Sequence, residues 1–210
     1  MKKIFIECCV ESYDEARLAE KKGADQIEVC SDLRNDGLTP DIQLIEKIVC
    51  NISIPIKVMI RPRVGNFYYS NSEMLTIKDQ ITNFKSIGID HIVFGVLDKN
   101  NIVNMDHVKK ISDWSAPMEI TFHKAIDASV EFFSDIDALV KTKRIDSLLT
   151  SGRSRTAERG SNIIKKVINN YGKEIKIISA GKITYKNLKA IHKKIGGTYY
   201  HGRKILGKLG

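Results

Sequence analysis

Two glutamates alternate with two cysteines at the ends of two short apolar runs near the N-terminus. Glu7 and Cys9 lie in the run IECC, and Glu28 and Cys30 lie in the run IEVC. Side chains two residues apart on a β-strand point to the same face, so each glutamate shares a face with a cysteine. Cu(I) prefers thiolate ligands at low coordination number, so Cys9 and Cys30 on neighbouring strands could bind one ion.

The other two cysteines fit such a site less well. Cys8 points away from Cys9 on the same strand, and it becomes a third ligand only if the strand bends at its end. Cys50 is expected at the end of a helix, where we predict that it packs as a small apolar residue. The chain has no Cys-x-x-Cys motif and no methionine-rich motif.

A second group of residues favours acid–base chemistry. Arg61 ends the third apolar run and His123 ends the fifth. In an enzyme, His123 or Glu28 would be the general acid or base, and Arg61 would stabilise a developing anion. Asp127, four residues after His123, would either orient the imidazole or cap the next helix. Glu7 would complete this catalytic group.

Glycines and basic residues follow several of the apolar runs, a composition typical of loops that bind anions. Glycine lets backbone N–H groups approach an anion, and lysine or arginine neutralises it. The alternative is that these glycines only serve tight turns. The predicted anion-binding residues are Arg63, Ser151, Gly152, Gly181, Lys182, His201, Gly202 and Arg203.

Eight short apolar runs, rich in β-branched residues, are predicted to be buried strands. They lie at residues 4–9, 26–30, 56–60, 91–97, 118–123, 147–150, 175–179 and 198–201. Amphipathic segments with helix signals separate them. A strand and a helix repeat about every 25 residues, which predicts a parallel sheet.

Capping residues mark where the helices should begin and end. Ser12 with Glu15 forms a capping box, and Thr39-Pro40 is an N-cap followed by a proline in the first turn. The other predicted caps and stops are Gly23, Ser72, Gly88, Asn104, Ser129, Thr184 and Gly196.

Eight strand–helix units favour a compact (β/α)8 TIM barrel, because no glycine-rich dinucleotide loop follows the first strand. We predict a single domain over residues 1–210. Only nine residues follow His201, so the final helix should be shortened or missing. Active sites of such barrels lie at the carboxyl ends of the strands, where the glutamates, cysteines, arginine and histidine described above would meet.

Composition restricts the partners. The chain has 34 basic and 25 acidic side chains, a net charge of +9, and its lysines are spread along the sequence. We therefore expect a solvated basic surface and no nucleic-acid partner. No apolar segment approaches the length of a membrane span or a signal-peptide core, so we expect a cytoplasmic protein with reduced cysteines and no membrane partner.

Several strings in the chain resemble the copper homeostasis protein CutC family, and the resemblance extends from end to end. The matching strings, in chain order, are Ile6-Glu7-Cys8-Cys9, Gly23-Ala24-Asp25, Ile27-Glu28-Val29-Cys30, Gly37-Leu38-Thr39-Pro40, Ile54-Pro55, Met59-Ile60-Arg61-Pro62-Arg63, Phe94-Gly95-Val96-Leu97, Thr121-Phe122-His123-Lys124-Ala125 with Asp127, Leu149-Thr150-Ser151-Gly152, and His201-Gly202.

The resemblance implies a (β/α)8 barrel, a homodimer and a role in cytoplasmic copper handling. Two functional hypotheses stay open at this point. In the first, thiols at the barrel mouth bind Cu(I). In the second, the protein is an enzyme that acts on a small phosphorylated or carboxylated metabolite. A structural alternative is that the charged residues at the mouth pair only with one another and close the barrel.

Overall fold

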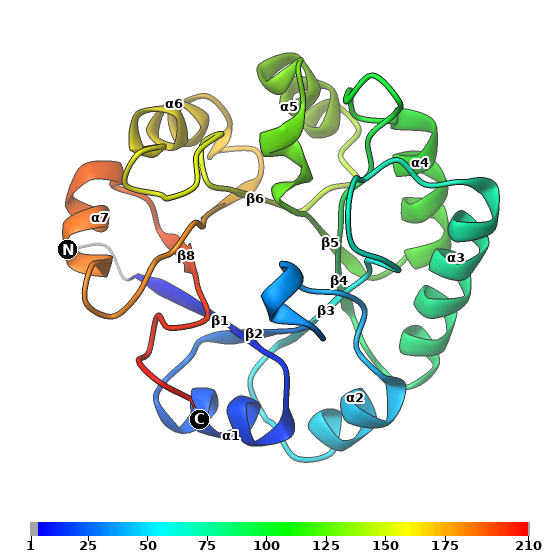
Figure 1. Ribbon diagram of the computed structural model, residues 1–210, viewed down its shortest axis with the longest axis horizontal. Helices are drawn as coiled ribbons and strands as arrows, with labels where there is room; N and C mark the ends of the chain where they lie inside the picture. Colours follow the sequence, from blue (N-terminus) through cyan, green and yellow to red (C-terminus); the bar gives the residue numbers. More distant parts are fainter. Residues whose placement is uncertain (1–3, 210) are drawn as a thin grey trace.

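Eight parallel strands close into a barrel in chain order in the computed structural model, which describes residues 4–209 (Figure 1). All eight predicted strands are present, and their ends differ from the predicted ones by at most three residues. The fourth strand, for example, ends at Phe94 rather than at residue 97. The strands are β1 (Phe5–Val10), β2 (Gln26–Val29), β3 (Ile56–Met59), β4 (His91–Phe94), β5 (Glu119–Phe122), β6 (Ser147–Thr150), β7 (Lys176–Ser179) and β8 (Tyr199–His201).

The register of the strands brings the N-terminal and C-terminal strands together. β1 pairs in parallel with both β2 and β8, so that Cys9 lies opposite Glu28 and Glu7 lies opposite His201. Residues separated by about 190 positions in the chain therefore share one side of the barrel interior. These strand pairings bring side chains near the carboxyl ends of β1, β2 and β8 together into one site.

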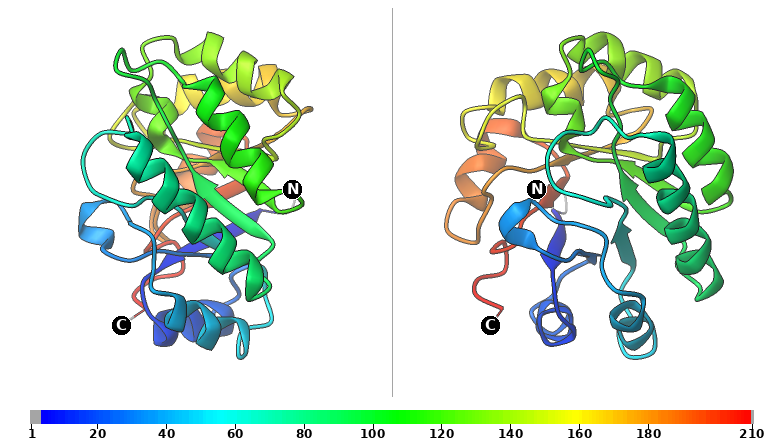
Figure 2. Two further views of the ribbon diagram at one scale, coloured as in Figure 1. Left: turned by 90° about the vertical axis from the view of Figure 1, so that its right-hand side faces the viewer. Right: turned by 45° about the vertical axis from the view of Figure 1, so that its right-hand side comes forward.

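Seven α-helices surround the barrel (Figures 1 and 2), and two short 3-10 turns follow β2 and β5. The predicted shortening at the C-terminus is confirmed, because residues 202–209 contain no helix and run beside α1 instead. Lys22, which directly follows α1, donates from its ammonium group to the carbonyl of Lys208. The helices are α1 (Tyr13–Lys21), α2 (Ile42–Val49), α3 (Asn71–Ser86), α4 (Met105–Ser115), α5 (Phe132–Lys141), α6 (Ser161–Tyr171) and α7 (Leu188–Ile195), and the turns are η1 (Leu33–Asn35) and η2 (Lys124–Ala128).

Helix starts were predicted less well than strands. Ser12 and Asn104 cap α1 and α4 as expected, although the carboxylate of Glu15 accepts from the N–H of Glu11 instead of completing a capping box. The predicted cap at Thr39-Pro40 is wrong. α2 starts after Asp41, and the Thr39 hydroxyl bonds to other elements.

Three other predicted caps are displaced along the chain. α3 is capped by Ser70 in a full capping box with Glu73, not by Ser72. α5 and α7 begin after Glu131 and Asn187, a few residues beyond the predicted Ser129 and Thr184. Gly23, Gly88 and Gly196 follow their helices with positive φ, as the sequence predicts. Within residues 4–209, no helix is both long and apolar enough to cross a membrane.

Candidate functional site

Strand alternation sorts the cysteines as the sequence predicts. Glu7, Cys9, Glu28 and Cys30 face the barrel interior, where Cys9 and Cys30 pack with Met59 and Val93. Cys8 lies on the opposite face of β1 in the layer between barrel and helices. Its thiol points to the carbonyl of Gly202 at 3.7 Å, and burial raises its pKa to about 12. Cys8 is therefore not positioned to join the other two thiols.

The Cys9 and Cys30 sulfur atoms are 3.9 Å apart. Oε1 of Glu28 lies 3.4 Å from the sulfur of Cys30 and 3.9 Å from that of Cys9. The three residues are between 1% and 5% exposed, so the group is shielded from solvent. We call Cys9, Cys30 and Glu28 the thiol cluster. Its three ligand atoms are mutually close enough to hold one metal ion.

A charged layer lies directly beneath the thiol cluster. Nδ1 of His201 is 2.8 Å from Oε1 of Glu7, and its Nε2 is 4.0 Å from Oε1 of Glu28. The other carboxylate oxygen of Glu7 forms an ion pair with Lys57 at 2.8 Å. His201 was predicted to bind an anion from a loop. The structure instead places its side chain inside the barrel, against two glutamates.

The sequence reasoning missed Lys57. This lysine is buried on β3, and its ammonium group also donates to the hydroxyl of Thr121 at 3.0 Å. Beyond it, Thr121 contacts Nε2 of His91 at 2.8 Å, near the amino ends of the strands. The signal was available, because Lys57 is four residues before Arg61 on the same strand face.

The electrostatics of this region follow from burial and close pairing. Burial disfavours the ionised form of Glu7, but Lys57 and His201 outweigh it and hold the pKa of Glu7 well below its usual range. Burial also lowers the pKa of His201, but the charge of Glu28 and the contacts with Cys9 and Glu7 raise it well above its usual value. His201 is therefore a cation that stabilises Glu7.

The two thiols of the thiol cluster, those of Cys9 and Cys30, differ in pKa. The hydrogen bond from Cys30 lowers the pKa of Cys9, and His201 adds to this effect. The same contact raises the pKa of Cys30 well above its usual value. Burial raises the pKa of Glu28. Cys9 is thus the thiol that loses its proton first.

The segment from residue 31 to residue 38 covers the thiol cluster and includes η1, which lies over the middle of the barrel in Figure 1. Leu33 packs against the cluster. A Cβ atom on Gly37 would be 3.1 Å from the sulfur of Cys30, so this glycine lets the backbone approach the thiol. Arg61 holds the segment by donating to the carbonyls of Asn35 and Gly37.

Neither alternative for Asp127 matches the structure, because its carboxylate does not contact His123 and α5 begins after Glu131. Nδ1 of His123 accepts from the N–H of Ala125, and its Nε2 has no hydrogen-bond partner among the described residues. The carboxylate of Asp127 instead accepts from the hydroxyls of Thr150 and Ser151 and from two backbone N–H groups of the loop after β6. Asp127 therefore organises that loop.

Most predicted anion-binding side chains have partners within the chain. Arg63 pairs with Glu73, and Arg203 pairs with Glu11 and lies close to Glu15. Ser151 donates to Asp127. Lys182, which adopts a left-handed conformation with φ of 55°, forms no ion pair within residues 4–209.

The glycines of the predicted anion-binding loops lie against neighbouring backbone. A Cβ atom on Gly152 would be 2.3 Å from the carbonyl oxygen of Gly160. A Cβ atom on Gly181 would be 2.8 Å from the backbone nitrogen of Ala157, and one on Gly202 would be 2.3 Å from the carbonyl oxygen of Ile183. Close packing of loop on loop is thus the reason for glycine at these positions.

The prediction that Cys50 packs in the core is wrong, because Cys50 is exposed at the end of α2. The helix presents Ile45 and Ile48 to the core, and Cys50 lies on the opposite, solvent-facing side of its last turn.

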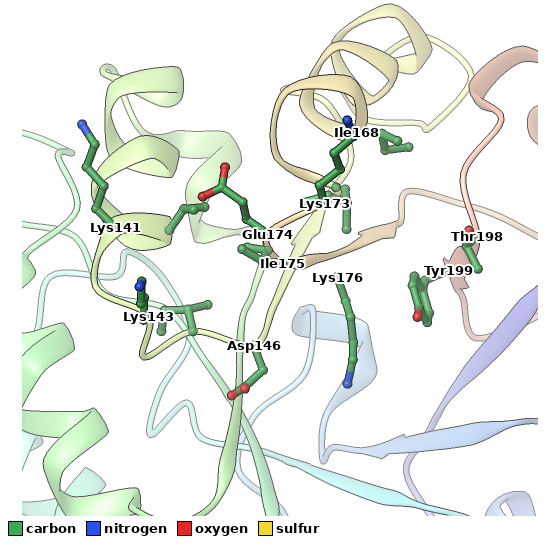
Figure 3. Close-up of a pocket in the computed structure, with 14 residues that line it drawn as sticks. Lys141, Lys143, Asp146, Ile168, Lys173, Glu174, Ile175, Lys176, Thr198 and Tyr199 are labelled. Carbon is green, nitrogen blue, oxygen red and sulfur yellow. The ribbon is translucent and has the colours of Figure 1, made fainter.

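Two surface hollows lie at the amino ends of the strands, away from the thiol cluster. A groove of about 780 Å³ runs between α5 and the start of β7 and β8, with lysines on its rim (Figure 3). A smaller hollow of about 60 Å³ reaches Glu7, Lys57 and His91 from the same end.

Comparison with known proteins gives one consistent result. The sequence profile of the CutC family matches residues 4–206. The human copper homeostasis protein cutC homolog is 34% identical over 197 residues, which cover 94% of this chain and 72% of the human protein. A CutC family protein of Treponema denticola is 33% identical, covering 96% of this chain and 81% of that protein.

Solved structures agree with the sequence comparison. A copper homeostasis protein CutC from Streptococcus agalactiae superposes with a TM-score of 0.91 at 26% identity, covering 96% of this chain and 99% of that chain. A dihydrodipicolinate synthase from Bacillus anthracis reaches a TM-score of 0.66 at 13% identity, covering 96% of this chain and 70% of that chain. The second similarity is one of fold alone.

Proposed function

This chain belongs to the CutC family of copper homeostasis proteins, and from that premise we propose that it binds one Cu(I) ion between Cys9 and Cys30. The observation that carries the proposal is the 3.9 Å separation of the two buried sulfur atoms. Two thiolates at a bond length of about 2.3 Å, as in zinc sites, are about 4.0 Å apart when they bind one ion at a trigonal angle. The pair is therefore already spaced for a shared ion.

Glu28 offers the ion a third ligand, and His201 offers a positive charge close to the two thiolates. The Glu28 carboxylate lies within 3.9 Å of both sulfurs and can act as a third ligand. Metal binding displaces thiol protons, and the hydrogen bond from Cys30, which lowers the pKa of Cys9, favours that loss. The positive charge of His201 beneath the cluster stabilises the thiolate that results.

We favour copper binding over an enzyme that acts on an anionic metabolite. The acid–base groups Glu28 and His123 are in the mouth, but Arg63, Arg203 and Ser151 are each paired with a carboxylate of the chain. Those groups would have to leave their partners before they could bind a substrate. The two thiols need no such rearrangement.

The test is an anaerobic Cu(I) titration against a competing chelator, carried out in a Cys50→Ser background so that the exposed thiol does not contribute. We expect one bound ion per chain. Cys9→Ser and Cys30→Ser should each weaken binding by at least about a hundredfold, because each removes one of two soft ligands.

Cys8→Ser in the same background is the matched control, since Cys8 is equally buried but faces the helix layer. Circular dichroism checks that each variant is folded. Unchanged affinity in both Cys9→Ser and Cys30→Ser would refute the proposal, as would a loss confined to Cys8→Ser. Because thiol ligands require reduced cysteines, the proposal also assigns the protein to the cytoplasm.

A further inference from the structure

Three buried polar groups at the barrel mouth have no hydrogen-bond partner among residues 4–209. They are Nε of Arg61, the hydroxyl of Tyr69 and Nε2 of His123. Their residues are 6%, 2% and 4% exposed, so bulk water does not satisfy them. Buried polar groups in folded proteins almost always have a partner, so three unpaired groups in one region require an explanation.

The three groups belong to one side of the mouth. The guanidinium carbon of Arg61 is 5.2 Å from the centroid of the Phe67 ring, and the ring of His123 is 5.0 Å from the same centroid. Tyr69 is two residues further along the same loop, where burial raises the pKa of its hydroxyl to about 12 and the charge and side-chain contact of Arg61 act against that rise. Arg61 acts on the pKa of His123 as well.

The Nε2 atom of His123 is held as a hydrogen-bond donor. Its Nδ1 accepts from the N–H of Ala125, which leaves the proton of the neutral ring on Nε2. The ring is neutral because burial, with the charge of Arg61, lowers its pKa to about 3. A Cβ atom on Gly95 would be 2.3 Å from Nδ1, so only glycine at that position leaves room for the imidazole. Gly95 after β4 and Ala125 after β5 together fix the orientation of the His123 ring.

The buried guanidinium of Arg61 has no carboxylate partner among the described residues. Its Nη atoms donate to the carbonyls of Asn35, Gly37 and Gly65, which fix the guanidinium but carry no net charge. Arg61 forms no ion pair with any carboxylate in the described part of the chain. A buried cation ordinarily has an opposite charge nearby.

We propose that Arg61, Tyr69 and His123 bind a small oxyanion, either a carboxylate or a phosphate group, in the barrel mouth beside the thiol cluster. An oxyanion supplies the missing negative charge and accepts hydrogen bonds from all three groups. The guanidinium, phenol and imidazole are donors suited to such oxygens. This site contains no thiol, so it stands independently of copper binding.

The test uses metal-free protein titrated with inorganic phosphate and, separately, with acetate, at an ionic strength held constant with chloride. Binding is followed by the NMR signals of the His123 imidazole nitrogens. We expect a saturable shift with at least one of the two anions. Tyr69→Phe removes the hydroxyl and keeps the ring, so it should weaken binding about tenfold.

The same variant separates a binding role from a structural one. The Tyr69 hydroxyl has no partner within residues 4–209, so Tyr69→Phe should not lower the Tm in anion-free buffer. Tyr68→Phe is the matched control, because Tyr68 is adjacent and exposed, and it should bind as the wild type does. The proposal is overturned if neither anion gives a saturable shift, if Tyr69→Phe binds normally, or if its Tm falls without any change in affinity.

Discussion

Inside the barrel, the charges of Glu7, Lys57 and His201 are buried in contact with one another. Each ion taken out of water carries a large desolvation cost, which is recovered only if its partners remain in place. Glu7 has both partners at 2.8 Å, and this explains how a carboxylate that is 2% exposed stays ionised. Sequence reasoning identified Glu7 as inward but assigned it to catalysis, because it did not count Lys57 on the same face.

Removing one charged side chain of this group should therefore destabilise the fold more than removing two opposite charges together. We expect Lys57→Met to destabilise the protein by about 3–5 kcal/mol, because it leaves Glu7 with a single counter-charge in the interior. The double variant Lys57→Met/Glu7→Gln should recover a large part of that loss. Urea unfolding followed by circular dichroism measures both. Strictly additive effects of the two single variants would contradict the pairing.

At the scale of elements, the covering segment from residue 31 to 38 controls access to the thiol cluster. Asp32 and Asp36 adopt left-handed backbone conformations, with φ of 48° and 66°, and Arg61 supplies two side-chain hydrogen bonds that hold the segment down. Such a segment opens more easily than the strands beneath it.

We expect Arg61→Lys to raise the rate at which a thiol reagent reacts with the thiol cluster by about tenfold or more, chiefly at Cys9, whose thiol loses its proton first. Lysine has no planar fork with which to replace the guanidinium, whose Nη1 donates to the Asn35 and Gly37 carbonyls while its Nη2 donates to the Gly65 carbonyl. The rate is measured with a chromogenic disulfide in a Cys50→Ser background. Arg34→Lys, an exposed arginine of the same segment, is the control and should react as the background does. Equal rates for Arg61→Lys and Arg34→Lys would remove Arg61 from this role.

At the scale of the whole molecule, the two ends of the barrel respond together to acid. His91 near the amino ends and His123 near the carboxyl ends are both buried, and burial lowers the pKa of each from 6.5 to about 3. A group whose pKa is lower in the folded state stabilises the fold above its unfolded pKa. That contribution is lost as the pH falls from about 6.5 towards 3.

His91→Gln should therefore flatten the pH dependence of stability. Between pH 6 and 4.5 the slope of the unfolding free energy against pH should fall by up to about 1.4 kcal/mol per pH unit, the share of one proton. Glu7, whose pKa is lowered in the fold, is present in both the wild type and the variant, so its own contribution cancels from the difference between the two curves. Denaturant unfolding at several pH values provides the measurement. Parallel curves for the variant and the wild type would show that His91 is not neutral in the fold.

The sequence by itself determined the eight strands, the barrel and the inward face shared by Glu7, Cys9, Glu28 and Cys30. These follow from local rules, since a two-residue period and β-branched runs fix which side of a strand is buried. The positions of helix caps were less certain, because several serines and threonines near each helix start are equally good local candidates.

Only the tertiary structure decided which side chains pair. His201 meets Glu7 because β8 closes the barrel against β1, and Arg61 reaches the Asn35 and Gly37 carbonyls because the covering segment folds over the mouth. Arg63 and Arg203 were predicted to bind an anion, and Asp127 to orient His123 or cap a helix, yet each has a partner elsewhere within the chain. Charge and hydrogen bonding in a buried site depend on contacts between residues far apart in sequence, and no local pattern encodes those contacts.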